Sequence, residues 1–289
     1  MREKLSFWVA GGDMRQAKLA EQLAADGHTV HTFALEKAHP LAGVEAGGLE
    51  EGGRARCAVL PLPAQGQGGL LNAPLAGEEH PMEEILDALR PGQIVLAGMV
   101  GEHIAALAAG RGIVLHDYFA REELAVANAV PTAEGAIQIA MEELPITLHG
   151  ARALVLGCGR VGRALAGRLA ALGARVGVAA RKWADLAWAE SWGFTPVPME
   201  ELEGYLGVWD LVINTIPAPV LHRRALAALC PDCLVVDLAS KPGGVDFEAA
   251  ARMGVRAIWT LSLPGKVAPV TAGRSIKSAI YNILHELGV

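Results

Sequence analysis

The stretch ARALVLGCGRVGRALAGRLAALGARVGVAARK, residues 151–182, decides the fold of the second half of the chain. An apolar run ends at Gly157, a helical segment rich in alanine follows, and the glycines between them form the pattern G-x-G-x-x-G. In a strand–turn–helix unit, such glycines allow a tight turn, a close approach to a diphosphate, and close packing of the helix on the strand. We therefore predict a dinucleotide-binding Rossmann domain over residues 150–269. The residues expected at the diphosphate are Gly157, Cys158, Gly159, Arg160, Val161 and Gly162.

The end of the next strand indicates which dinucleotide is bound. NAD sites usually carry an Asp or Glu here, which accepts a hydrogen bond from the ribose 2′-hydroxyl. In this chain Ala180 is followed by Arg181 and Lys182, and the first carboxylate is Asp185. A guanidinium can donate two hydrogen bonds to a phosphate, and the lysine adds positive charge. We therefore expect Ala180, Arg181 and Lys182 at the ribose and favour NADP over NAD, the alternative being NAD binding beside two solvated cations.

Later strands of the same domain end in short polar or glycine-containing loops. Open parallel sheets bind ligands at the carboxyl ends of their strands, so these loops are expected to line the cofactor, although each could also be an ordinary loop. The strands are predicted over residues 151–156, 175–180, 211–214, 234–237 and 255–258. The expected lining residues are Asn214, Thr215, Ile216, Pro217, Ala239, Ser240, Pro264 and Gly265.

The first half of the chain also alternates between strand and helix patterns. Strands are predicted over residues 5–10, 28–34, 57–60, 93–97 and 113–116, with helices over 14–25, 82–89 and 102–109. This alternation predicts a second doubly wound α/β domain over residues 1–130, with irregular chain over 41–56 and a long loop over 61–81.

The segments between and after the two domains are expected to be helical. Pro131 suits the start of a helix, so we predict one helix over 121–127 and a separate one over 132–144, within an interdomain segment 131–149. The last helix, over 272–287, is amphipathic, and we expect residues 270–289 to pack back on the first domain.

The composition excludes several classes of protein. Of 289 residues, 52% are hydrophobic and 19% charged, which suits large buried cores. The net charge of −6 argues against a nucleic-acid partner, and no window reaches the roughly 18 apolar residues of a membrane span. Four unevenly spaced cysteines fit a reducing cytoplasm, and the single CxxC at 230–233 lacks the further ligands of a metal site, so none is predicted.

Six separated segments together resemble the family of the dipicolinate synthase A subunit. They cover both halves of the chain, and the resemblance weakens over residues 41–81. The last segment is also similar to a region of methylenetetrahydrofolate dehydrogenases. The segments are GGDMRQ (11–16), NAVPTAEGAIQIA (128–140), LHGARALVLGCGRVG (148–162), NTIP (214–217), DLASKPGGVDF (237–247) and LPGKVAPVTAG (263–273).

This resemblance implies a flavodoxin-like N-terminal domain followed by an NADP-binding Rossmann domain. It implies an oxidoreductase that acts on a CH–CH or CH–NH group of a dihydropyridine dicarboxylate. Dihydrodipicolinate, formed from 4-hydroxytetrahydrodipicolinate by loss of water, would be oxidised to dipicolinate during sporulation, in the cytoplasm of the mother cell. The implied partner is the smaller B subunit of dipicolinate synthase, and we also expect a homo-oligomer.

A dianionic substrate needs cations and N–H donors around it. We expect Arg15 at a helix start, Lys241 and Lys266 on the Rossmann side, and Thr132 with the first turn of its helix to bind the carboxylates. Glu134 is a candidate proton acceptor.

Each of these assignments has an ordinary alternative. Arg15 could be a solvated first-turn arginine, and Asp13 is expected to cap its helix. A first-turn Glu134 could serve only the helix dipole.

Two other functions remain open from the sequence. One is another two-domain dehydrogenase of the shikimate or methylenetetrahydrofolate type. The other is a nucleotide-binding subunit without chemistry of its own, because no unmistakable acid–base pair is present.

Overall fold

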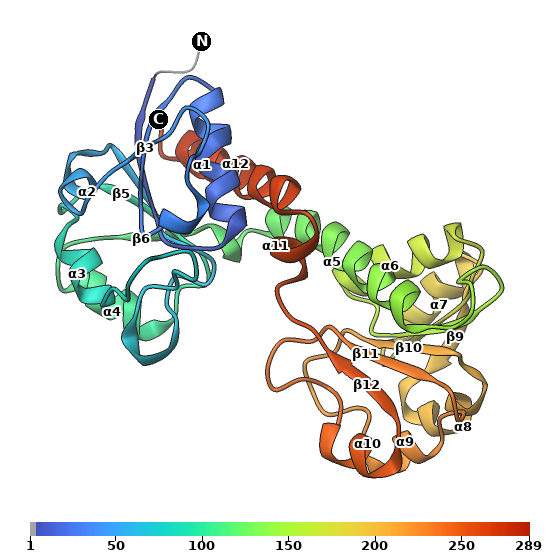
Figure 1. Cartoon of the computed structure of the whole chain (residues 1–289). Coiled ribbons are helices and arrows are strands. Elements are labelled where there is room, and N and C mark those ends of the chain that lie inside the picture. Colours follow the sequence, from blue (N-terminus) through green and yellow to red (C-terminus); the bar gives the residue numbers. More distant parts are fainter. Residues whose placement is uncertain (1–3) are drawn as a thin grey trace. The chain divides into compact units, whose positions relative to one another are not determined.

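The computed structural model describes residues 4–289 and contains two units, each with its own parallel sheet (Figure 1). The first unit comprises the chain up to Asn128 together with Pro264–Val289, and the second comprises Ala129–Leu263. The first three residues of the predicted 1–130 domain lie outside the described part of the chain.

The sheet of the first unit has the strand order β3-β2-β1-β4-β5-β6. Without the two-residue edge strand β3, this is the order of flavodoxin-like folds, as predicted. The central strand β1 is buried from Phe7 to Ala10 because both faces of the sheet are covered. The strands are β1 (Ser6–Ala10), β2 (Thr29–Phe33), β3 (Glu45–Ala46), β4 (Cys57–Val59), β5 (Ile94–Ala97) and β6 (Leu115–Asp117).

The helices of the first unit largely follow the predicted ranges. The predicted ones are α1 (Met14–Ala25), α3 (Met82–Asp87) and α4 (Glu102–Ala109), and the short helix α2 (Glu50–Arg54) was not predicted. The strand β3 and the helix α2 lie in the segment 41–56, which was predicted to be irregular. They were missed because both elements are too short to show a periodic pattern.

The C-terminal helix α12 (Pro269–Glu286) packs against α1 within the first unit, and Figure 1 shows the two side by side. Gly273 makes this possible, since a Cβ there would lie 2.8 Å from the carbonyl oxygen of Arg15. The apolar side chains of α12 join those of α1 in one core cluster, which includes Leu19, Ala20, Leu23, Ile276, Ala279, Ile280 and Ile283.

The sheet of the second unit has the order β12-β11-β10-β7-β8-β9, which is the order of dinucleotide-binding Rossmann folds and confirms the predicted fold class. The direction of winding reverses between β7 and β10. The strands are β7 (Arg152–Leu156), β8 (Arg175–Ala180), β9 (Thr195–Pro198), β10 (Leu211–Asn214), β11 (Leu234–Asp237) and β12 (Arg256–Trp259).

Strand β9 was not predicted, because prolines at 196 and 198 interrupt the strand pattern. Its position explains why they are tolerated: β9 is the edge strand beside β8, where missing N–H donors do not break a second ladder.

Helices cover both faces of this second sheet. Residues of α6 (Arg160–Ala171) and α7 (Trp183–Ser191) contribute to the core on one face, and those of α8 (Leu202–Tyr205), α9 (Arg223–Ala227) and α10 (Phe247–Met253) to the core on the other.

Two predicted boundaries were wrong. The helices expected over 121–127 and 132–144 form one helix, α5 (Glu122–Glu143), with Pro131 inside it. A proline inside a helix removes one backbone hydrogen bond and crowds the carbonyl group four residues earlier. The helix continues because the turns on both sides are anchored in cores through Leu124 and Ala133.

The second unit also ends before residue 269. Helix α11 (Leu263–Val267) belongs to the first unit from Pro264 onward. A Cβ on Gly265 would lie 2.8 Å from Asp13 Oδ2, so this turn packs directly on the start of α1.

Within residues 4–289, none of the helices has both the length and the apolar character needed to cross a bilayer.

Replacing Ile280 with alanine tests the packing of α12 on α1. The side chain is fully buried, so its truncation leaves a cavity, and the free energy of unfolding should fall by about 2–4 kcal/mol. Val270→Ala is the control on the same helix, because Val270 is 46% exposed. Equal urea midpoints for the two variants would contradict the packing described here.

Candidate functional site

The turn between β7 and α6 needs glycine for three different reasons. Gly157 has a φ of +103°, and a Cβ there would lie 2.5 Å from Thr215 Oγ1. Gly162 packs on the turn itself, since its Cβ would lie 2.0 Å from the Gly157 carbonyl oxygen. A Cβ on Gly159 would meet nothing within 4 Å. The space at Gly159 is therefore open to a ligand.

The start of α6 offers N–H donors to an anion. Gly159 is the N-cap residue and has no capping side chain, and the first turn contains no acidic residue. The N–H groups at the start of a helix lack partners within the helix and lie at the positive end of its dipole. The arrangement suits a diphosphate at residues 157–162.

Arg163 stabilises the turn between β7 and α6. The sequence analysis did not identify this residue. Its Nε donates to the Cys158 carbonyl oxygen at 2.8 Å, and its Nη2 lies 3.1 Å from Asp185 Oδ1 on α7. Its guanidinium also lies 5.9 Å from the centroid of the Trp192 ring. The Cys158 side chain, with a further contribution from Asp185, raises the pKa of Arg163 above its ordinary value. The motif gave no sign of this role, since position 163 lies outside the glycine pattern.

The end of β8 carries positive charge. Arg181 and Lys182 are exposed, and within residues 4–289 neither forms an ion pair. Asp185, the first carboxylate after them, is engaged by Arg163. The Ala180 side chain is buried in the core, so only its backbone can face a ligand.

The ends of β10 and β11 are tied together by side chains. Asn214 Nδ2 donates to Asp237 Oδ1 at 2.8 Å and to the Ile216 carbonyl oxygen at 3.0 Å. Thr215 Oγ1 donates to the Leu156 carbonyl oxygen at 2.8 Å. Asn214 and Thr215 were predicted to line the cofactor, and the structure uses these side-chain groups to shape the loops. In the loops themselves, Pro217 and Ser240 are exposed, whereas Ile216 is half-buried and Ala239 buried.

The structure brings most predicted cofactor residues to one edge of one sheet. Residues 157–162, 180–182, 214–217 and 239–241 all lie at or after the carboxyl ends of β7, β8, β10 and β11. Pro264, Gly265 and Lys266 do not belong to this group, because they form part of the first unit and not of the Rossmann unit as predicted.

The predicted anion site at Thr132 was wrong in its placement. Thr132 and Glu134 lie in the interior of α5, which begins at Glu122, so no helix start is available there. Glu134 is exposed and lies 3.7 Å from the guanidinium of Arg168 on α6.

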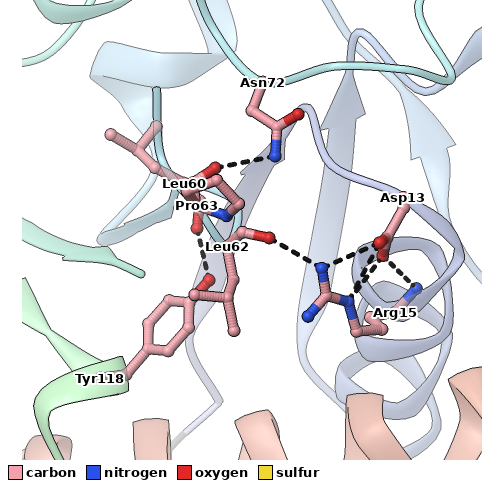
Figure 2. Close-up of polar contacts among 7 residues, drawn as sticks. All are labelled: Asp13, Arg15, Leu60, Leu62, Pro63, Asn72 and Tyr118. Carbon is pink, nitrogen blue, oxygen red and sulfur yellow. Dashed lines mark hydrogen bonds and ion pairs between the residues drawn. The ribbon is translucent and has the colours of Figure 1, made fainter. Parts of the chain in front are cut away.

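Arg15 is held inside the first unit and is not a solvated first-turn arginine (Figure 2). Its Nε and Nη2 bind the Asp13 carboxylate, and Nη2 also donates to the Leu62 carbonyl oxygen at 2.8 Å. Asp13 Oδ1 accepts a hydrogen bond from the Arg15 backbone N–H, which confirms the predicted helix cap. Among the described residues, nothing accepts a hydrogen bond from Arg15 Nη1.

The same region holds the chain that follows β4. Tyr118 Oη donates to the Leu60 carbonyl oxygen at 2.9 Å, and Asn72 Nδ2 donates to that of Pro63 at 3.0 Å, as Figure 2 shows. Burial raises the pKa of Tyr118, so its hydroxyl stays a neutral donor. Together with the bond from Arg15 to Leu62, three side chains donate hydrogen bonds to carbonyl groups between residues 60 and 63. These bonds fix the path of the loop after β4.

Side chains that could ligate a metal are scattered. Within residues 4–289, no three or more His, Cys, Asp or Glu side chains gather into a group that could hold an ion. Cys230 and Cys233 are free thiols, and burial raises the pKa of Cys233 to about 12. Cys233 is therefore protonated at neutral pH.

Comparison with known proteins gives the same match for sequence and structure. Residues 6–119 match the model of the N-terminal domain of the dipicolinate synthase A subunit. The A subunit of dipicolinate synthase from Bacillus subtilis (strain 168) is 32% identical over 287 residues, which cover 98% of this chain and 97% of that protein.

Solved structures extend the match to the whole fold. The crystal structure of the A subunit of dipicolinate synthase from Bacillus halodurans has a TM-score of 0.89 at 31% identity and covers 97% of both chains. The transhydrogenase from Sinorhizobium meliloti has a TM-score of 0.75 at 18% identity, over 98% of this chain and 94% of that one, and shares the fold. With a relative of more than 30% identity matched over nearly its whole length, the chain belongs to the family of the dipicolinate synthase A subunit.

Proposed function

We propose that this chain is an NADP-dependent oxidoreductase that oxidises dihydrodipicolinate to dipicolinate. The observation that carries the proposal is the glycine turn of the second unit, where Gly159 leaves open space in front of the first N–H groups of α6. Membership of the family suggests a dihydropyridine dicarboxylate as the substrate, and the names of the relatives suggest dipicolinate as the product.

NADP is favoured over NAD by the charge at the end of β8. A 2′-phosphate there would meet the exposed Arg181 and Lys182, and the neighbouring Asp185 is already engaged by Arg163. A guanidinium binds phosphate strongly through two charge-assisted hydrogen bonds. The 2′-hydroxyl of NAD would find no carboxylate acceptor at this position.

The bound nicotinamide would accept a hydride from the substrate. Dihydrodipicolinate loses two electrons and one proton as this hydride, a second proton goes to solvent, and the ring becomes aromatic. Much of the driving force therefore lies in the product, so the protein mainly has to orient its substrate. This explains how the chemistry can proceed without an obvious acid–base pair.

The carboxylates of the substrate require cations. Lys241 is exposed in the loop after β11 and Lys266 is exposed in α11, and within residues 4–289 neither forms an ion pair. Arg15 contributes only its Nη1, because its other donors are bound to Asp13 and Leu62. We assign Lys241 as the substrate cation of the second unit, name Arg15 and Lys266 as separate candidates on the first unit, and leave Thr132 and Glu134 out.

The relatives are named as the A subunit of their enzyme, and this name implies a partner subunit. We propose that the partner is the smaller B subunit of dipicolinate synthase, that the chain itself forms a homo-oligomer, and that the reaction takes place in the cytoplasm of a sporulating cell. A nucleotide-binding role without chemistry remains the competing function, since Asn214, Thr215 and Asp237 are occupied with one another or with backbone.

The reaction is tested by following NADPH formation with 4-hydroxytetrahydrodipicolinate, using the purified chain by itself and together with its partner. Lys241→Ala should raise the KM for the precursor by about tenfold with a smaller effect on kcat, because one charged contact to a carboxylate is lost. Lys37→Ala, an exposed lysine of the first unit, is the control. No NADPH in either mixture would reject the enzymatic role, and an unchanged KM would reject Lys241 as a substrate cation.

Gly159→Ala separates nucleotide binding from folding. The new methyl group meets no protein atom, so the melting temperature should fall only slightly, because alanine is a poorer N-cap residue than glycine. The methyl group occupies the space in front of the α6 N–H groups. The Kd values for NADPH and NADH, measured by nucleotide fluorescence, should both rise by about tenfold or more. Gly167→Ala, also in open space on α6, should leave both unchanged. Normal binding by Gly159→Ala would rule out this diphosphate site.

Arg181→Ala tests the preference for NADP. Loss of its hydrogen bonds to the 2′-phosphate should weaken NADPH binding by roughly 10–100-fold and change NADH binding by less than about twofold. Arg175→Ala removes an exposed arginine at the opposite end of β8 and is the matched control. A similar loss for both nucleotides would show that Arg181 does not recognise the 2′-phosphate.

A further inference from the structure

Asp237 is a buried carboxylate that the predicted site did not include. It is the last residue of β11, in the otherwise apolar run LVVDL, and its side chain is fully buried. Carboxylates are rarely buried completely unless they are bound by donors or cations. Within residues 4–289, no lysine, arginine or histidine forms an ion pair with it. Its burial must therefore be balanced by hydrogen bonds.

Three N–H donors surround this carboxylate. Oδ1 accepts from Asn214 Nδ2 at 2.8 Å and from the backbone N–H of Ala239 at 3.0 Å. Oδ2 accepts from the backbone N–H of Gly244 at 2.7 Å. Ala239 and Gly244 are the two ends of the loop that follows β11. One side chain therefore closes this loop and ties it, through Asn214, to the end of β10.

The surrounding residues leave little room for a different arrangement. A Cβ on Gly244 would lie 2.1 Å from Asn214 Nδ2, and Gly243 has a φ of +85° with its Cβ position 3.1 Å from Asp237 Oδ2. On the other side of the loop, Trp259 Nε1 donates to the Ala239 carbonyl oxygen at 2.9 Å. The path of residues 239–244 therefore depends on the Asp237 carboxylate.

The strand order assigns this loop to one half of the dinucleotide. The order β8-β7-β10-β11 puts the loop after β11 three strands away from Arg181, or about 14 Å at ordinary strand spacing. A dinucleotide with its diphosphate at residues 157–162 and its adenosine ribose at Arg181 has to extend its other half toward β10 and β11. The loop at residues 239–244 is then beside the nicotinamide half.

We propose that Asp237 is a positioning residue that holds the loop 239–244 for the nicotinamide half of the dinucleotide. The inference rests on the proposed nucleotide-binding function. Asp237 itself contacts neither cofactor nor substrate and acts through the backbone of Ala239 and Gly244 and the side chain of Asn214.

The test compares a complete dinucleotide with a fragment of it. Asp237→Asn keeps the size of the side chain but turns an N–H group toward a buried N–H donor, so one end of the loop is released. Titration calorimetry should show NADPH binding weakened by about tenfold or more, while 2′,5′-ADP, which lacks the nicotinamide half, binds within about twofold of the original protein. Asp246→Asn is the matched control, because Asp246 only caps α10 through the Ala249 N–H. It should bind both probes normally.

The outcomes separate this inference from the proposed function. If the original protein binds neither probe, the nucleotide site itself is wrong, and the role of Asp237 is overturned with it. In another outcome, the original protein binds both probes while Asp237→Asn weakens binding of neither, or of both equally. In that case only the positioning role of Asp237 is overturned.

A second measurement applies even if Asp237→Asn does not fold. In the original protein without nucleotide, the amide hydrogens of Ala239 and Gly244 should exchange slowly, because both are bound to a buried carboxylate. Exchange of either amide at the rate of an open loop would overturn the proposal.

Discussion

The close contact between Gly162 and the carbonyl oxygen of Gly157 is the constraint on which the nucleotide site depends. A Cβ at position 162 would lie 2.0 Å from that oxygen, so only glycine lets α6 begin directly over the end of β7. This contact aims the first N–H groups of the helix at the edge of the sheet where its winding reverses. Arg163 then holds the turn from the helix side through the Cys158 carbonyl oxygen.

Polar side chains at the other strand ends mainly bind one another or nearby backbone. Thr215 is bound to the Leu156 carbonyl oxygen, and Asn214 is bound to Asp237. Buried polar groups without partners are costly, so these bonds hold the loops in one arrangement before any ligand arrives. The exposed groups Arg181, Lys182 and Lys241 retain the charge that a phosphate or a carboxylate would need. The second unit therefore separates the residues that shape its loops from those that can meet a ligand.

The first unit follows the same principle with different residues. Arg15, Asn72 and Tyr118 each donate to a carbonyl group between residues 60 and 63, directly after β4. Gly265 packs against the start of α1, and α12 covers the same helix further along, so the C-terminal segment completes this unit. Arg15 is thus a structural donor that keeps one nitrogen, Nη1, for a further acceptor.

Local patterns in the sequence determined the two parallel-sheet domains, the glycine turn and the cationic end of β8. Each depends on residues close together in the chain: apolar runs, spaced glycines, or the absence of an acid after Ala180. Short or interrupted elements leave no such pattern. The strand β3 is too short to show a period, and β9 contains two prolines.

Only the tertiary structure decided the contacts between distant segments. Pro131 continues α5 because packed turns lie on both sides, and Pro264 joins the first unit because Gly265 fits against Asp13. The role of Asp237 depends on its hydrogen bonds with Asn214 and Gly244, and no sequence motif links these residues to it. A sequence pattern reports which residues share a face or a turn, whereas a buried hydrogen bond depends on which chain segments the completed fold brings within about 3 Å of one another.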